Sequence, residues 1–278
     1  MSDPDDVRPF DPAAVPVKDA STVVLVRDSA RGIETFLLQR VVGMDFAGGM
    51  TVFPGGGVDR SDSDATVRWA GPDVQWWADR FATTPERAQA LVLAAVRETF
   101  EECGVLLAGP DDTTVVADTA RYAGARRRLE ARELSFGDFL ARENLVVRTD
   151  LLRPWANWIT PLGERRRYDT YFFVAAAPQG QHADGETSEA ERVRWLTAEE
   201  ALADWKAGGS VLLPPTWSQL AALARYDTVA DVLAAQPDIP AVLPSMSRVD
   251  GHIHISFGGD EGYYEAGGPH PWARRADI

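Results

Sequence analysis

The stretch Arg97-Glu98-Thr99-Phe100-Glu101-Glu102-Cys103-Gly104-Val105 is the most informative part of this sequence. If the stretch is helical, at about 100° per residue, Glu98, Glu101 and Glu102 fall on one face of the helix. The apolar side chains between residues 92 and 103 then fall on the opposite face. This division predicts a helix that packs against a sheet and keeps its carboxylates free of the core.

The sequence marks both ends of that helix. Thr84-Pro85-Glu86 is a typical helix start, because Thr can cap the first turn, Pro suits the first helical position and Glu suits the first turn. Gly104 is a typical terminator, because glycine readily adopts the left-handed conformation that ends a helix. We therefore predict a helix over residues 85–103.

Three carboxylates at this spacing repel one another, at a cost of about a few tenths of a kcal/mol per pair on an exposed helix. A bound Mg²⁺ or Mn²⁺ would reverse the sign of that interaction, since both ions prefer carboxylate oxygens and keep waters for a phosphate-bearing substrate. Arg97 directly precedes the first glutamate, where a guanidinium can hold a carboxylate in a fixed rotamer. For the three glutamates taken alone, a solvated acidic helix face is the alternative interpretation.

Phe53-Pro54-Gly55-Gly56-Gly57 precedes the helix, and its glycines allow the backbone to pass close to the carboxylates or to a ligand. Together the two segments resemble the Nudix box, the loop–helix–loop motif of the Nudix hydrolases. The family pattern is Gly-x5-Glu-x7-Arg-Glu-aliphatic-x-Glu-Glu-x-Gly-aliphatic. This chain matches the pattern at Gly56, Arg97, Glu98, Glu101, Glu102, Gly104 and Val105.

The chain departs from the family pattern at two points. Gly56 and Arg97 lie 41 positions apart, 27 more than in the pattern, so an insertion interrupts the box. The first Glu of the pattern has no clear match, since counting forward from Gly56 reaches Asp62 and counting back from Arg97 reaches Gln89. That Glu is mostly structural in the family, so the resemblance still implies metal binding.

The insertion makes the chain resemble a larger Nudix subgroup, whose eukaryotic members include the peroxisomal coenzyme A diphosphatases. Residues 46–56, 155–161, 167–173 and 213–216 also carry this likeness, which covers roughly residues 20–235. Another coenzyme A-directed pattern in the family has an Arg where this chain has Asp45.

The resemblance implies a metal-dependent diphosphatase. Glu98, Glu101 and Glu102 would hold one or more Mg²⁺ or Mn²⁺ ions, which lower the pKa of a bound water for attack on phosphorus. Arg97 would orient Glu101 without touching the substrate. The number of metal ions is left open.

The resemblance also implies a general base and substrate contacts. A Glu of the box or of the later acidic loop over residues 186–191 would accept the proton of the water, and within that loop we favour Glu189. The backbone at Gly55 and Gly56 would lie against the substrate. Arg167, the last residue of an arginine triplet, is the candidate phosphate ligand, with a solvated turn as the alternative.

A nucleoside-diphosphate-linked small molecule is the substrate class that the resemblance implies, with coenzyme A or acyl-coenzyme A first. A pyrophosphatase for ADP-ribose, a dinucleotide or a nucleotide sugar is the second interpretation. A non-catalytic Nudix module that senses a ligand or binds a protein is the third, and the retained carboxylates and Arg97 disfavour it.

Strand-like and helix-like runs follow one another along the rest of the chain, which indicates the α/β class. The resemblance implies an α/β/α sandwich with a mixed sheet, a helical insertion and a C-terminal extension. We divide the chain into an N-terminal tail (1–19), a Nudix hydrolase domain (20–235) and a C-terminal extension (236–278). The domain holds the insertion at about 60–83 and a helical segment at about 120–144. We expect strands at 23–26, 36–38, 51–53, 158–160, 171–175, 193–195 and 252–257, and later helices near 198–206, 215–225 and 228–235.

The 278 residues include 28 Lys+Arg and 42 Asp+Glu, a formal net charge of −14. This acidic excess argues against a nucleic-acid polymer as partner, and no run approaches the roughly 18 apolar residues that span a membrane. The single cysteine excludes an internal disulfide, and neither a secretory stretch nor a Ser-Lys-Leu ending is present. We therefore expect a cytoplasmic protein, with a homodimer left open.

Overall fold

A computed structural model describes residues 14–43, 47–64, 66–249 and 252–266. Within these ranges one mixed sheet contains β1 (Val17–Ser29), β2 (Gly32–Arg40), β3 (Thr51–Val52), β4 (Gly55–Gly57), β8 (Leu152–Ile159), β9 (Arg167–Ala176), β10 (Ala190–Thr197) and β11 (Ala241–Val242). Its main path runs β10-β2-β1-β9-β8-β11, with β3 paired to β2 and β4 paired to β1. The pairs β1·β9 and β8·β11 are parallel, and the other pairs are antiparallel.

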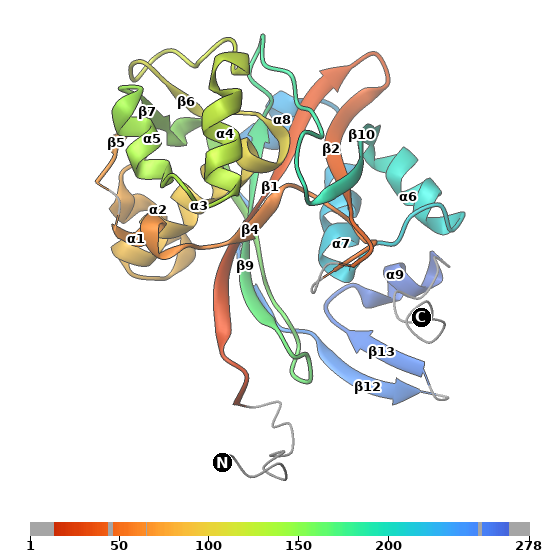
Figure 1. Cartoon of the computed structure of the whole chain (residues 1–278). Helices are drawn as coiled ribbons and strands as arrows, with labels where there is room; N and C mark the ends of the chain where they lie inside the picture. The colour runs from red at the N-terminus through yellow and green to blue at the C-terminus, as the bar shows by residue number, and fades with distance from the viewer. Residues whose placement is uncertain (1–13, 44–46, 65, 250–251, 267–278) are drawn as a thin grey trace.

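Helices cover both faces of this sheet, which confirms the predicted α/β/α sandwich (Figure 1). One face carries α1 (Arg60–Asp64), α2 (Val74–Phe81), α3 (Pro85–Cys103), α4 (Ala123–Glu130) and α5 (Phe136–Arg142). The other face carries α6 (Ala198–Lys206), α7 (Pro214–Leu223), α8 (Val229–Ala234) and α9 (Asp260–Glu265).

Alternation along the central strands assigns their side chains to two cores. In β1, Val23 and Leu25 belong to the α3 side, whereas Val24 and Val26 belong to the α6–α7 side. This is the period of two expected for a strand that is buried on both faces.

Helix α3 occupies the predicted residues. The Thr84 side chain accepts a hydrogen bond from the Arg87 amide at 3.3 Å, and Pro85 is the first helical residue. Gly104 ends the helix with a φ of 73°, the left-handed conformation that glycine adopts without strain. The local signals therefore place the three box glutamates in the last turns of a helix whose other face is buried against β1.

The predicted insertion is folded together with the helical segment that follows α3. A small sheet, β5-β7-β6, consists of β5 (Arg68–Ala70), β6 (Ala108–Gly109) and β7 (Val146–Arg148). Two one-turn 3₁₀ helices, η2 (Ala120–Tyr122) and η3 (Thr149–Leu151), precede α4 and β8. The small sheet was not expected, because strands of two or three residues are too short to show a periodic pattern.

Both ends of the described chain differ from the simple division into tail, domain and extension. Strand β1 already begins at Val17, inside the predicted tail, because it pairs in parallel with β9 from Arg167 onward. In the predicted extension, β12 (Ser245–Val249) and β13 (His252–Ser256) form a hairpin, and α9 packs against α7. In the part of the chain that the structure describes, no helix is long and apolar enough to cross a membrane.

Candidate active site

Arg97 organises the end of α3. Its guanidinium is buried and donates from Nε and Nη2 to the Asp62 carboxylate at 3.0 and 2.9 Å. Nη2 also donates to the Gly57 carbonyl at 2.8 Å, while Nη1 donates to Glu98 Oε1 at 2.7 Å and lies 3.5 Å from Glu101 Oε1. A planar group with five donors thus ties the glycine-rich strand, α1 and two box carboxylates together.

Asp62 resolves the ambiguity over the first acidic position of the box. Its side chain is buried in α1 and meets Arg97, as the forward count from Gly56 allows. Gln89, which the backward count reaches, lies in the first half of α3 instead. The structural carboxylate of the box is therefore best placed at Asp62, which puts the extra residues between Asp62 and Arg97.

The glycines of β4 bring the backbone against the glutamates. The Gly55 amide donates to Glu102 Oε2 at 2.8 Å. A Cβ atom on Gly56 would lie 2.6 Å from Glu98 Oε1, closer than real Cβ atoms approach. A side chain at Gly56 would therefore displace the Glu98 carboxylate from its contact with Arg97.

Arg40, at the end of β2, is a site residue that the sequence did not reveal. Its Nη2 donates to Glu189 Oε2 at 2.7 Å, and its Nη1 lies 3.7 Å from Glu102 Oε1. The Val41 amide also donates to the Glu189 carbonyl at 3.0 Å, so the predicted base is held beside the box. Arg40 Nε is buried and has no hydrogen-bond acceptor among the described residues.

Negative charge exceeds positive charge in this cluster. The ion pairs join Arg97 and Arg40 to five carboxylates: Asp62, Glu98, Glu101, Glu102 and Glu189. Burial raises the pKa of Glu101 to about 8, although Arg97 acts in the opposite direction. Burial likewise raises the pKa of Glu98, and burial together with the charge of Glu98 raises the pKa of Glu102 well above its usual range. Such a deficit of positive charge is what a bound cation would offset.

The chemistry of these groups fits a hard divalent cation, because the buried Glu102 and the half-buried Glu98 and Glu101 offer carboxylate oxygens and a surplus of negative charge. Among the described residues, however, no three His, Cys, Asp or Glu side chains converge as a metal-holding group. Glu98 and Glu101 face Arg97, while Glu102 faces the Gly55 amide. The metal-ligand role of the three glutamates therefore stays a prediction.

A cleft of about 670 Å³ opens beside this cluster. Its lining includes Gly55, Gly56, Glu98 and Glu189, so the predicted base and a predicted metal ligand face one space. Arg167 does not line the cleft, because it is buried and its Nε donates to the Thr160 carbonyl at 3.1 Å. Arg166, in the connection just before β9, does line it.

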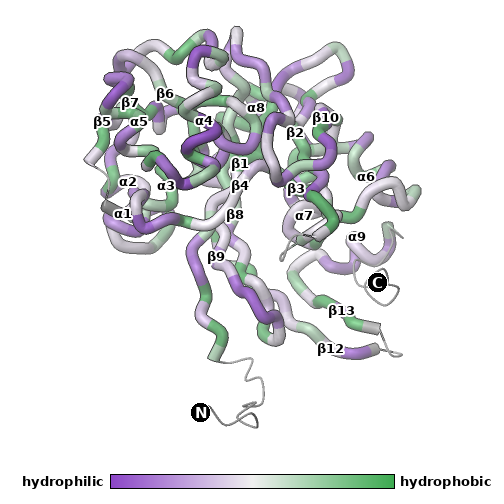
Figure 2. The backbone as a smooth tube through the Cα atoms, viewed as in Figure 1, coloured by the Kyte–Doolittle hydropathy of each residue, from purple (hydrophilic) through white to green (hydrophobic). Residues whose placement is uncertain are grey.

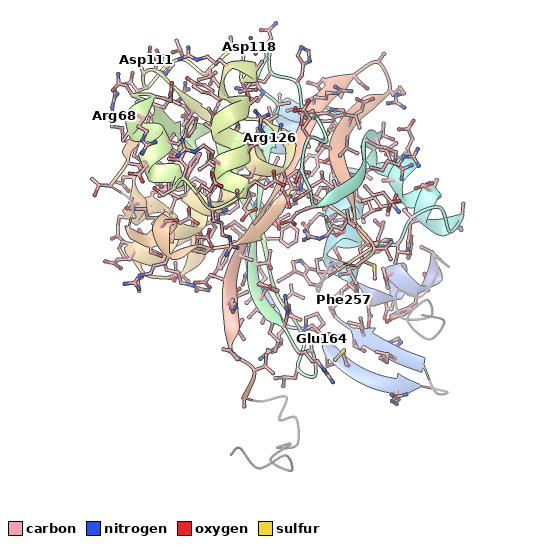
Figure 3. The ribbon with its side chains drawn as sticks, viewed as in Figure 1. Arg68, Asp111, Asp118, Arg126, Glu164 and Phe257 are labelled. Carbon is pink, nitrogen blue, oxygen red and sulfur yellow. The ribbon has the colours of Figure 1, made fainter. Side chains whose placement is uncertain are left out.

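Arg126 is a second arginine whose role the sequence did not reveal. It lies on α4 near the middle of the molecule (Figure 3) and is buried. Its Nε donates to the Glu101 carbonyl at 3.0 Å and its Nη1 to Asp184 Oδ1 at 2.7 Å. Arg126 thus satisfies a backbone carbonyl in the last turn of α3 and supports the segment that holds the glutamates.

Comparison with known sequences finds one family model and relatives that carry the same name. The NUDT19 Nudix domain family matches residues 77–225, a segment that contains α3 and begins after the glycines of β4. Acyl-coenzyme A diphosphatase NUDT19 of Gallus gallus is 28% identical, over 84% of this chain and 73% of the relative. The protein of the same name from Homo sapiens is 26% identical, over 85% of this chain and 74% of the relative.

Comparison with solved structures supports the same architecture. A Nudix hydrolase from Alicyclobacillus acidocaldarius superposes with a TM-score of 0.66 and 24% identity, over 82% of this chain and 100% of that chain. At this identity the likeness establishes the fold. It shows that the sandwich, with α3 against the central strands, is an arrangement already observed by crystallography.

Proposed function

The chain belongs to the Nudix hydrolases, in the family of the NUDT19 Nudix domain, and from this we propose that it hydrolyses the diphosphate linkage of coenzyme A and acyl-coenzyme A. The match over residues 77–225 carries this proposal, since relatives similar along most of the chain are named acyl-coenzyme A diphosphatases. The buried cluster of carboxylates around Arg97 supports an enzyme over a non-catalytic module, because a binding module does not need such a costly arrangement.

In this proposal the box residues divide the work of binding and positioning. Glu98, Glu101 and Glu102 would hold Mg²⁺ or Mn²⁺, which when bound neutralises a diphosphate and lowers the pKa of a bound water. Arg97 positions Glu98 and Glu101 through its ion pairs and stays out of contact with the substrate. The backbone of β4 lies along the cleft, where a diphosphate can approach closely.

Glu189 is proposed as the general base. It lines the cleft together with Glu98, and its side chain is 43% exposed, so water and substrate can reach it. Arg40 holds its carboxylate in place and itself lines the cleft. Arg167, the predicted phosphate ligand, is buried and does not line the cleft, so it is not proposed to contact the substrate.

The finer parts of the sequence-based expectation remain proposals. They are the identity of the ion as Mg²⁺ or Mn²⁺, a cytoplasmic location and a homodimer. Nothing in the described residues favours ADP-ribose, a dinucleotide or a nucleotide sugar over coenzyme A.

Product identification tests the function. The protein is incubated with coenzyme A, acetyl-coenzyme A and ADP-ribose, each with Mg²⁺, with Mn²⁺ or with EDTA, and the products are identified by mass spectrometry. Cleavage of the coenzyme A diphosphate predicts adenosine 3′,5′-bisphosphate and 4′-phosphopantetheine, in the metal-containing samples alone. Tight binding of these compounds without any product would favour the ligand-sensing module instead.

A further inference from the structure

The cleft beside the carboxylates extends across the sheet to an apolar end. In the strand register, Gly57 lies opposite Ala20, Ala20 opposite Thr170, and Thr170 opposite Trp158. Since adjacent strands lie about 4.8 Å apart, Trp158 stands roughly 14 Å from the glycine strand. Both Gly57 and Trp158 line the same cleft, so one elongated molecule can occupy both ends.

The chemistry of the cleft changes along this line. Its near end presents the Glu98 and Glu189 carboxylates, which suits a cation and a diphosphate. Phe172 of β9, which belongs to the same core as Trp158, lines the cleft, as do Ile159 and Pro161 directly after Trp158. Glu164 and Arg166 line it farther along the β8–β9 connection. An aliphatic group gains free energy from burial against these apolar side chains.

The C-terminal segment supplies a wall of this apolar end. Ile255 of β13 lines the cleft and is 4% exposed. Its backbone is fixed on both sides by one side chain, because the Ile255 amide donates to Tyr264 Oη at 2.8 Å and Tyr264 Oη donates to the Ile255 carbonyl at 3.0 Å. The Ile255 side chain is thus held at a fixed depth in the cleft.

Neighbouring contacts anchor this wall to the sheet and to α7. The ring of Phe257 packs edge-on against Trp158, with centroids 5.3 Å apart. Tyr263 stacks on Trp205 at 5.1 Å and donates a hydrogen bond to the Leu212 carbonyl at 3.0 Å. Figure 3 shows Phe257 at the end of the molecule where the β8–β9 connection and β13 lie, and Figure 2 shows hydrophobic colour in β13. The wall is therefore part of the packed core and not a loose flap.

The arm between the diphosphate and the thioester of acyl-coenzyme A has a matching length. About thirteen covalent bonds separate the pantetheine-side phosphorus from the sulfur, and an extended chain advances roughly 1.2 Å per bond, which gives roughly 15 Å. With the diphosphate at the glycine strand, the thioester would reach Trp158, and the acyl chain would continue toward Ile255.

We propose that the apolar end of the cleft receives the acyl chain and that Ile255 limits the chain length the enzyme accepts. This inference rests on the proposed hydrolysis of coenzyme A. The C-terminal extension would then take part in substrate choice. Its Ile255 would contact the acyl chain, far from the phosphorus that reacts. Contacts between Ile255 and the acyl chain change the relative kcat/KM of the acyl substrates. They leave the kcat/KM for unacylated coenzyme A unchanged, because coenzyme A has no acyl chain.

Steady-state kinetics on coenzyme A and its acetyl, hexanoyl and palmitoyl thioesters tests this inference. Ile255→Trp narrows the apolar end and should lower kcat/KM for the hexanoyl and palmitoyl substrates about tenfold, with coenzyme A within twofold of wild type. Ile255→Ala should shift the preference toward the longer chains. Ser247→Ala, an exposed position on the same hairpin, is the matched control and should reproduce the wild-type profile.

The outcomes separate this inference from the proposed function. If the wild-type protein releases no product from any of these thioesters or from coenzyme A, the proposed function fails and the inference fails with it. If the wild type is active but both Ile255 variants keep the wild-type profile, the inference alone is overturned. It is also overturned if Ile255→Trp slows coenzyme A as much as the acyl substrates, since this end of the cleft would then hold the nucleoside.

Discussion

Gly56 places the backbone of β4 directly against the carboxylate of Glu98, a proposed metal ligand. A Cβ atom there would lie 2.6 Å from Glu98 Oε1, whereas a Cβ on the adjacent Gly57 would find only the Asp19 carbonyl at 3.9 Å. Gly56→Ala should therefore displace the Glu98 carboxylate and lower kcat by about 100-fold. Gly57→Ala is the matched control and should stay near wild-type activity. Equal activity of the two variants would contradict the role given to Glu98.

The raised pKa of Glu101 makes a second prediction at this scale. A carboxyl whose folded-state pKa is about 8 stabilises the fold below its ordinary pKa of about 4.5, and this contribution is lost as the pH rises through 8. The melting temperature of metal-free protein should therefore fall between pH 6 and 9, with Glu98 and Glu102 acting in the same direction.

Calorimetry of the protein in EDTA, with Glu101→Gln as the comparison, measures this effect. The variant has no carboxyl to ionise at position 101, so its melting temperature should fall less steeply with pH than that of the wild type. Excess Mg²⁺ should also flatten the wild-type curve, because a bound cation favours the ionised carboxylates. A metal-free melting temperature that rises over this pH window would contradict the burial argument.

Helix α1, although only five residues long, contributes a buried ion pair to the stability of the site. It delivers Asp62 to Arg97, and both side chains are buried, so removal of the carboxylate leaves the guanidinium without its main partner. Asp62→Ala should lower the free energy of unfolding by about 3–5 kcal/mol. Asp59→Ala removes a surface contact of 3.9 Å to the 81% exposed Arg132 and should cost less than about 0.5 kcal/mol. Urea denaturation measures both, and similar losses would refute the pairing.

At the scale of elements, the sequence was most informative where the signals are local. Thr84, Pro85 and Gly104 act within one helical turn of their position, so the bounds of α3 were predictable. The pairing of Asp62 with Arg97 spans 35 positions and that of Arg40 with Glu189 spans 149, so neither contact leaves a local pattern. The glutamates of the site could be found from the sequence, but its two arginine-centred networks could be assembled only in three dimensions.

The whole molecule depends on its C-terminal segment for part of the second core. Tyr263 is 3% exposed and stacks on Trp205, and its removal opens a cavity between α7 and α9. Tyr263→Ala should therefore lower the free energy of unfolding by about 3–5 kcal/mol, as truncation of a buried aromatic side chain does. Glu261→Ala, an exposed change on the same helix, should leave the denaturation midpoint unchanged. A small loss in Tyr263→Ala would mean that this segment is not integral to the fold.

The sandwich and the position of the carboxylates within it followed from the sequence, whereas the place of residues 236–266 did not. The strand expected at 252–257 matches β13, but the short strands β11 and β12 were not expected, and contacts such as that of Phe257 with Trp158 join positions too far apart to leave a local pattern. The same limit explains Arg167, because the sequence does not show that its guanidinium is buried and donates to the Thr160 carbonyl. The charge of −14 is consistent with the site, since part of the acid is gathered at the end of α3.

Turnover of coenzyme A by the wild type and by Glu101→Gln, assayed side by side with Mg²⁺ and with product detection by mass spectrometry, tests the diphosphatase assignment most directly. The wild type should release adenosine 3′,5′-bisphosphate and 4′-phosphopantetheine. The variant should be slower by at least about 100-fold while its circular dichroism spectrum stays unchanged. Equal turnover by the two proteins, or no release of these products by the wild type, would contradict a carboxylate-dependent diphosphatase at the end of α3.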